Sequence, residues 1–132
     1  VEGPGYNGIG QVRSIAKAYG VFATGGRELG IKKETLDALT SPAVPPSLGL
    51  RDEVLKVETS FSLGYCKPFP DFKFGSSDKA FGIPGTGGSL GYADPDVQVG
   101  FAYAPNKWKF YLFNDSRQMA LRDALYACLK EM

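Results

Sequence analysis

A glycine-rich stretch at residues 81–95 has the residue pattern in this sequence that is best suited to chemistry. It reads Phe-Gly-Ile-Pro-Gly-Thr-Gly-Gly-Ser-Leu-Gly-Tyr-Ala-Asp-Pro, with five glycines between positions 82 and 91. Glycine is used this densely where the backbone must approach another group closely or adopt a positive φ. An alternating strand pattern follows directly. The stretch therefore predicts a strand that enters a tight turn beside another group.

Two catalytic sequence motifs are matched inside this stretch, but each lacks residues or elements that its chemistry requires. Residues 87–91 fit G-x-S-x-G, but a nucleophile elbow needs a helix after its serine and a histidine base. Here a strand is expected after Ser89, and the chain contains no histidine. Residues 82–89 fit G-x-x-x-x-G-x-S, but Gly88 stands where a phosphate-binding loop needs lysine. We expect neither a Ser89 nucleophile nor a nucleotide site.

A third pattern, S-x-x-K, occurs at Ser14 and Lys17. One helical turn could bring the lysine amine to the serine hydroxyl, so that the amine accepts its proton. Both residues, however, fall on the polar face of an amphipathic helix. We interpret them as a solvated surface.

Residues 81–95 resemble the run F-G-H-P-G-T-G-G-S-x-G-x-A-D-P of β-lactamase-related esterases and animal β-lactamase-like proteins. These proteins belong to the serine β-lactamase and penicillin-binding protein superfamily. Two more segments resemble that family. Residues 7–19 match N-G-x-G-x-x-R-S-x-A-x-x-Y, and residues 32–39 match S-P-E-T-x-x-x-L, with Lys32-Lys33 in place of Ser-Pro. The resemblance covers nearly the whole chain.

The resemblance implies that this stretch is the third active-site element of the family, Lys-Thr-Gly in β-lactamases. The best match puts that triplet at Ile83-Pro84-Gly85, with the Thr86 N–H as the oxyanion-hole donor. Another register puts it at Gly85-Thr86-Gly87. The candidate substrate-binding residues are therefore Ile83, Pro84, Gly85, Thr86 and Gly87, and no side chain here is a credible catalytic group. The nucleophile and base are expected upstream.

Ile83 departs from the family pattern, because the first triplet position is basic or histidine there. Ile83 can neither donate a proton nor hold a carboxylate. If the protein is a hydrolase, the resemblance implies hydrolysis of an uncharged or lipid-like ester or amide through an acyl-enzyme. The alternative is a catalytically lapsed relative that serves as a scaffold or assembly protein.

Composition narrows the remaining function classes. The chain has 132 residues, a net charge of +1, 43% hydrophobic and 22% charged residues, which predicts a globular domain and no nucleic-acid partner. No apolar run is long enough for a membrane span, and we expect no metal and no cofactor. The two cysteines, Cys66 and Cys128, favour free thiols in a reducing intracellular compartment over a disulfide. A homo-oligomer is left open.

The predicted fold class is α+β: an antiparallel sheet of three or four strands flanked by the first and last helices. It is the C-terminal part of the β-lactamase/transpeptidase-like fold, a single incomplete domain over residues 1–132. The first helix is expected at 8–24, with Asn7 as N-cap and Gly25-Gly26 as stop. The other expected elements are a helix at 32–39, an irregular proline-rich connection at 41–56, a strand at 57–65, a loop or irregular hairpin at 67–79, strands at 80–83, 90–93 and 97–103, and a strand or packed loop at 108–113.

The last helix is expected to begin at Asp115 or Ser116, with Gln118 as capping-box partner. Its apolar stripe is predicted at Leu121, Leu125, Cys128 and Met132. Because Val1 is neither an initiator methionine nor part of a signal peptide, we expect the chain to be a piece of a longer one.

Overall fold

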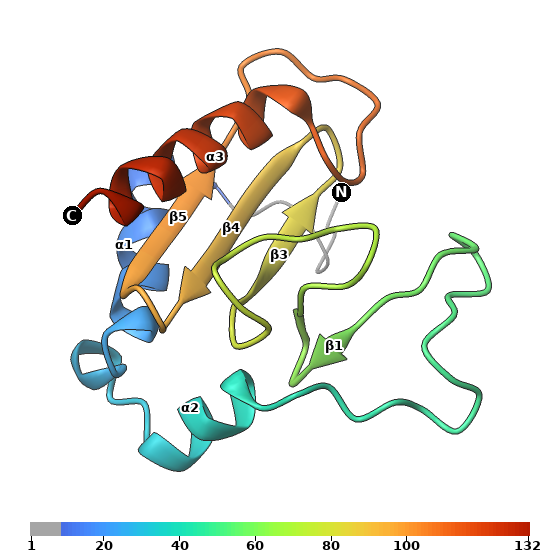
Figure 1. The fold of residues 1–132 in the computed structure, drawn as a ribbon, viewed down its shortest axis with the longest axis horizontal. Helices are drawn as coiled ribbons and strands as arrows, with labels where there is room; N and C mark the ends of the chain where they lie inside the picture. Colours follow the sequence, from blue (N-terminus) through green and yellow to red (C-terminus); the bar gives the residue numbers. More distant parts are fainter. Residues whose placement is uncertain (1–8) are drawn as a thin grey trace.

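The computed structural model describes residues 9–132, so the predicted N-cap Asn7 lies outside the described residues. Figure 1 shows a sheet with α1 behind it and α3 across its front. The elements are α1 (Val12–Ala23), a 3-10 turn (Arg27–Leu29), α2 (Lys33–Thr40), β1 (Phe61–Ser62), β2 (Tyr65–Cys66), β3 (Phe81–Gly85), β4 (Ser89–Asp94), β5 (Val99–Tyr103) and α3 (Ser116–Lys130).

The sheet is antiparallel, with strand order β1-β2-β3-β4-β5. This confirms the predicted α+β class and the flanking first and last helices. The strand number differs from the expected three or four, because β1 and β2 form a hairpin of two residues each. The long pairings are β3 with β4 and β4 with β5, each joining five residue pairs.

Alternation along the strands divides the core into two layers. On one face Phe81 and Ala93 pack with Ala23 of α1 and Leu39 of α2. On the other face, Leu90 and Tyr92 pack with aromatic residues of the 67–79 loop, and Tyr126 of α3 lies against them. The loop therefore acts as a third covering element beside the helices.

The predicted strand at 57–65 is wrong. Leu63 and Gly64 have φ of 48° and 83°, so the chain reverses there and Phe61 pairs with Cys66. Two consecutive positive φ values are the feature of a type I′ hairpin turn, which normally uses Asn-Gly. Leu-Gly gave no such signal, and the alternation across it resembled one continuous strand.

The predicted apolar stripe of the last helix is also wrong. Leu121 is 57% exposed and Met132 is 99% exposed, whereas Gln118 and Arg122 are buried. Arg122 finds a partner on this inward face, because its Nη1 donates to the Lys73 carbonyl at 2.6 Å, whereas Gln118 Nε2 is buried without a hydrogen bond among the described residues. Asp115 is the N-cap through the Arg117 N–H at 3.0 Å, and within residues 9–132 no bond joins Gln118 to the Asp115 amide.

Other predicted segments agree with the structure, and where the prediction left a choice open the structure decides it. α1 ends at Ala23, and the predicted stop follows it: Gly25 and Gly26 have φ values of 101° and 71°, and the Gly26 N–H donates to the Val21 carbonyl at 2.8 Å. The helix begins at Val12 and not at the predicted residue 8, because Gln11 has extended backbone angles. Residues 67–79 form a loop. Residues 108–113 are a packed loop and not a strand, and both cysteines are free thiols.

Candidate functional site

The candidate site is the hairpin that joins β3 to β4. Gly85 pairs with Ser89, and the Gly88 N–H donates to the Gly85 carbonyl at 3.1 Å. Gly87 has a φ of 95° at the third position of this four-residue turn, which is the conformation that a type II turn requires and that favours glycine. Thr86 occupies the second position and is exposed.

A segment just before α3 supports this turn. The Gly87 N–H donates to the Tyr111 carbonyl at 2.9 Å, and a side chain at Gly87 would collide with the Trp108 ring. A side chain at Gly88 would collide with the Asp115 carboxylate. The two glycines are therefore required by close packing as well as by their positive φ.

Asp115 is fixed in place beneath the turn. It is 1% exposed, and Arg117 Nε donates to its Oδ1 at 2.9 Å. Arg117 also donates from Nη1 to the Lys107 carbonyl at 2.8 Å. The hydrogen bonds from Arg117 lower the pKa of the Asp115 carboxyl, so the support stays ionised. The sequence predicted Asp115 as a cap but missed its contact with Gly88.

The backbone edge beside Thr86 is open. β2 pairs with β3 at the single position Cys66–Gly82, so among the described residues Ile83, Pro84 and Gly85 pair with β4 alone. Pro84 suits such an edge because it has no N–H to donate. In residues 9–132 the Thr86 amide makes no hydrogen bond. A free N–H at the end of an open strand edge can stabilise a negatively charged oxygen.

The structure brings the five predicted site residues together on this hairpin. Ile83 is 42% exposed and shares a depression of about 200 Å³ with Ile15 and Tyr19 of α1. Ile83, at the first position of the triplet, therefore presents an apolar surface. Burial raises the pKa of Tyr19 to about 12, and the neighbouring Tyr65 adds to the effect.

The serine motifs that the sequence argued against lie close to the site, Ser89 in the hairpin itself and Ser14 beside Ile15 and Tyr19, but neither has a catalytic arrangement among the described residues. Ser14 and Lys17 are exposed on α1, and no hydrogen bond joins them in the described part of the chain. Ser89 opens β4 and is followed by strand, not helix. Its Oγ lies against Gly85, where an added side chain would collide with it.

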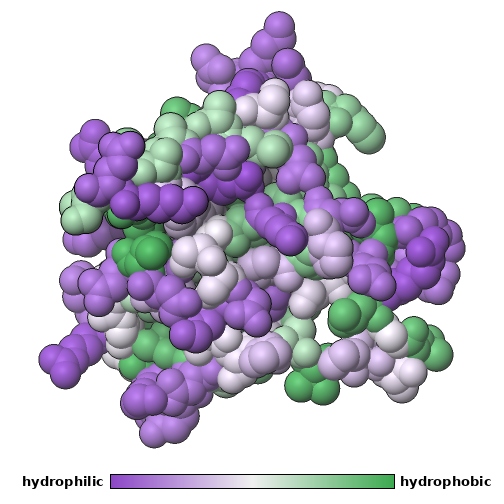
Figure 2. Space-filling model, in the orientation of Figure 1, coloured by the Kyte–Doolittle hydropathy of each residue, from purple (hydrophilic) through white to green (hydrophobic). Residues whose placement is uncertain are grey.

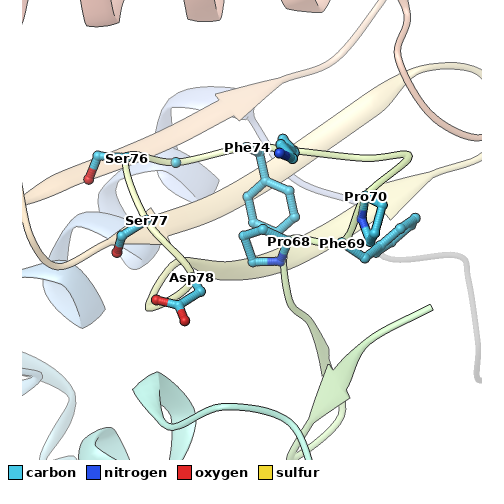
Figure 3. A pocket seen from close by; sticks show the side chains of 9 residues that line it. Pro68, Phe69, Pro70, Phe74, Ser76, Ser77 and Asp78 are labelled. Carbon is cyan, nitrogen blue, oxygen red and sulfur yellow. The ribbon is translucent and has the colours of Figure 1, made fainter. Parts of the chain in front are cut away.

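A larger depression lies elsewhere, inside the loop between β2 and β3 (Figure 3). Its volume is about 460 Å³ and none of residues 83–87 lines it. In Figure 3, Ser76, Ser77 and Asp78 lie at one end of its lining, and Phe69 and Pro70 lie at the other. Because a single loop forms it, it brings no distant residues together.

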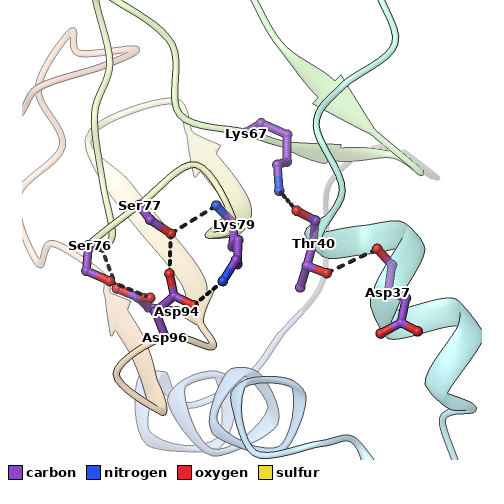
Figure 4. A network of polar contacts seen from close by, with 8 residues as sticks. All are labelled: Asp37, Thr40, Lys67, Ser76, Ser77, Lys79, Asp94 and Asp96. Atoms are coloured by element: carbon purple, nitrogen blue, oxygen red, sulfur yellow. Dashed lines mark hydrogen bonds and ion pairs between the residues drawn. The ribbon is translucent and has the colours of Figure 1, made fainter.

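A buried polar network that the sequence did not reveal fixes this loop to the sheet (Figure 4). Asp94 of β4 is fully buried and accepts hydrogen bonds from Ser76 Oγ at 2.9 Å and Tyr126 Oη at 2.6 Å. Nearby, Asp96 accepts from Lys79 Nζ at 2.8 Å. Asp94 thus ties the loop and α3 to the strand that follows the glycine turn.

The described residues offer few other ligand sites. No group of three or more His, Cys, Asp or Glu side chains in residues 9–132 is placed to hold a metal ion. In that same range no helix has the length and apolarity needed to cross a bilayer.

Several known proteins resemble this chain in sequence or in structure, although a scan against protein-family models finds no match. The esterase/beta-lactamase LipL of Mycobacterium tuberculosis is 34% identical over 106 residues, which are 80% of this chain and 24% of that protein. A penicillin-binding protein homologue from Caulobacter crescentus has a TM-score of 0.74 at 36% identity. A family VIII carboxylesterase has a TM-score of 0.74 at 33% identity.

Each of the two solved structures is matched over 86% of this chain and 30% of its own length. The antiparallel sheet, its covering helices and the glycine-rich hairpin define a part of the β-lactamase and penicillin-binding protein fold. Together these likenesses support a β-lactamase-like esterase domain for this chain, matched to a portion of each relative. The chain spans between about a quarter and a third of the length of these relatives.

Proposed function

We propose that this chain supplies the oxyanion-hole strand of a β-lactamase-like serine hydrolase that cleaves an ester or amide. The observation that carries the proposal is the Thr86 amide, which is unengaged within residues 9–132 and lies at the open edge of β3. The relatives named esterase and carboxylesterase support the reaction class. The proposal includes a nucleophile and base contributed by residues upstream of this sequence.

The chain's own part in the reaction would be electrostatic. A serine oxygen attacks the substrate carbonyl carbon, and the carbonyl oxygen becomes negatively charged. The Thr86 N–H donates to that oxygen, and a second donor comes from the nucleophile's own segment. Collapse of the intermediate expels the alcohol or amine, and water then hydrolyses the acyl-enzyme through a second intermediate at the same donors.

The support beneath the turn serves this role. An oxyanion donor is effective when it is already oriented before the charge develops. The Gly87–Tyr111 hydrogen bond and the Gly88–Asp115 contact hold the two residues that directly follow Thr86. Trp108 and Asp115 are therefore positioning residues in this proposal.

A catalytically lapsed scaffold or assembly protein is the second candidate. The observation in its favour is Ile83, which stands where the family places a basic residue or histidine and lines an uncharged depression. In such a protein the hairpin would keep its fold but would no longer take part in catalysis.

The test replaces Thr86 by proline in the full-length product of the gene that encodes this chain. Proline is favoured at the second position of a type II turn, so Thr86→Pro removes the N–H while keeping the turn. Thr86→Ala is the matched control because it keeps the N–H. We expect Thr86→Pro to lower kcat for p-nitrophenyl butyrate by about 100-fold or more and Thr86→Ala to stay within about threefold of wild type.

Equal activity of the proline and alanine variants would contradict the oxyanion role of Thr86. Folded wild-type protein with no hydrolysis above the solvent rate would favour the lapsed scaffold. Circular dichroism and the thermal midpoint of each variant establish folding before the rates are compared.

A further inference from the structure

Two apolar depressions lie on the α1 side of the sheet and meet at one pair of side chains. Ile15 and Tyr19 line both of them. The nearer depression, of about 200 Å³, is completed by Ile83 and Gly85 of β3 and by Tyr103 of β5. It therefore begins at the strand that leads into the Thr86 turn.

The second depression continues from the same pair away from the turn. Its volume is about 370 Å³, and Phe22 of α1 and Tyr65 of β2 close it. The Tyr65 ring lies 6.4 Å from the Tyr19 ring and 6.1 Å from the Phe22 ring, both at steep angles. These edge contacts hold the aromatic wall in place.

The lining of both depressions is uncharged. Among the described residues that form them there is no aspartate, glutamate, lysine or arginine. Because burial raises the pKa of Tyr19 to about 12, its hydroxyl is neutral at physiological pH. A charged ligand would lose its hydration here without gaining an ionic partner, whereas an alkyl chain would gain about 25 cal/mol for each Å² of apolar surface removed from water.

Two side chains leave apolar surface available to such a chain. Ile15 is 41% exposed and Ile83 is 42% exposed, and both line the nearer depression. The size and mainly apolar lining of the farther depression are those of ligand sites in general, which run from about 300 to 1,000 Å³.

We infer that the Ile15–Tyr19–Ile83 surface binds the acyl chain of an uncharged ester whose carbonyl lies at the Thr86 turn. Short acyl groups fill the space between Ile83 and Tyr19. Longer chains pass Tyr19 toward Phe22 and Tyr65. Gly85 connects the acyl-chain surface to the turn, because it lines the nearer depression and its carbonyl also accepts the hydrogen bond that closes the turn. The inference rests on the proposed hydrolase function.

The test measures binding without chemistry in the 132-residue chain. Methyl hexanoate and monomethyl adipate are titrated into ¹⁵N-labelled protein at pH 7; the two esters are similar in length, and only the second ends in a carboxylate. We expect saturable amide shifts from methyl hexanoate at Ile15, Tyr19, Ile83 and Gly85. Monomethyl adipate is expected to bind at least tenfold more weakly.

Matched variants locate the site. Ile83→Lys places a charge in the nearer depression, and Leu121→Lys places the same charge on an exposed residue of α3, across the sheet. We expect Ile83→Lys to weaken methyl hexanoate binding about tenfold or more and to favour monomethyl adipate, while Leu121→Lys leaves both affinities unchanged.

Several results would overturn the inference. They are equal affinities for the two esters, equal effects of the two lysine variants, and shifts concentrated on exposed apolar loop residues such as Val44 and Leu48. Concentration-dependent shifts at Ile15 and Ile83 without any ester would assign the surface to a second copy of the chain. Since no nucleophile is needed, ester binding with no hydrolysis by the full-length protein would refute the proposed function and leave the binding site established.

Discussion

Gly88 lies directly against the buried Asp115 carboxylate, and its φ of 97° is one that other residues rarely adopt. Two separate costs therefore oppose any side chain at this position. One is the strain of the left-handed region, about 1–2 kcal/mol. The other is the displacement of a carboxylate that Arg117 holds in place. The shape of the turn at residues 85–88 depends on both.

Gly88→Ala should lower the free energy of unfolding by about 3 kcal/mol, from backbone strain plus overpacking. Gly25→Ala is the matched control: its φ is 101° and an added side chain there meets no atom within 4 Å. The control should lose about 1–2 kcal/mol from strain alone. Urea unfolding followed by circular dichroism measures both, and equal losses would show that the Asp115 contact has no energetic role.

The hairpin that carries the candidate site was predictable, and the contacts that support it were not. The order of the glycines, Pro84 and Thr86 along the chain was enough to identify the hairpin. The Gly88–Asp115 and Gly87–Trp108 contacts join segments that no local pattern connects, so sequence periodicity could not predict them. Capping chemistry found Asp115 for its role at the start of α3, which is a local property.

At the scale of elements, α1 lies on β5 through two glycines. A side chain at Gly100 would come within 2.5 Å of Gly20 Cα, so the helix backbone rests on the strand itself. This close approach places Ile15 and Tyr19 beside β3, where the inferred acyl surface is formed.

Gly100→Ala should separate α1 from the sheet and cost about 3 kcal/mol of unfolding free energy. Gly20→Ala is expected to have the opposite sign. Gly20 is inside α1, an added side chain there meets no atom within 4 Å, and replacing a helical glycine by alanine gains about 1 kcal/mol. Thermal and urea unfolding of both variants test this; destabilisation by Gly20→Ala would refute the packing described.

Lys67 connects β2 to the end of α2. It is 2% exposed, and its Nζ donates to the Leu39 and Thr40 carbonyls at 3.0 and 3.3 Å (Figure 4). Burial lowers the pKa of Lys67 from 10.5 to about 8, partly offset by Asp78. The folded state therefore binds fewer protons than the unfolded state between pH 8 and 10.5.

Stability should accordingly rise with pH across that window relative to Lys67→Met. The slope of the difference approaches about 1.4 kcal/mol per pH unit. The raised pKa of Cys66, also caused by burial, acts equally in both proteins and cancels in the difference. Urea unfolding at pH 7, 8, 9 and 10 gives the slope. A difference in stability that does not change with pH would show that folding does not lower the pKa of Lys67.

Helices and strands with strong periodicity or glycine stops were predicted well, and the errors have physical causes. The 57–65 segment alternates across a turn made by Leu63 and Gly64, and alternation alone cannot show a reversal. In α3 the predicted stripe assumed that apolar residues face inward. Tyr126 turns inward to meet Asp94, and Gln118 and Arg122 follow on the same face.

At the scale of the whole molecule, much apolar surface is exposed. Figure 2 shows hydrophobic side chains gathered over the loop between α2 and β1, where Val44, Leu48 and Val54 are exposed. The outer edge of β5 pairs with no other described strand. Open edges and apolar patches of this kind mark surfaces that other protein segments cover. They accord with a chain that matches 24–30% of its relatives' length.

The most direct test of the hydrolase proposal is covalent labelling of the full-length gene product with a fluorophosphonate or penicillin-type serine probe, located by mass spectrometry. We predict modification of a single serine outside residues 1–132, in an S-x-x-K context, and loss of labelling when that serine is replaced. Folded protein that takes no label would contradict the hydrolase proposal and favour the scaffold. A label on Ser14 or Ser89 would show that the nucleophile is in this chain and would contradict the division of roles proposed here.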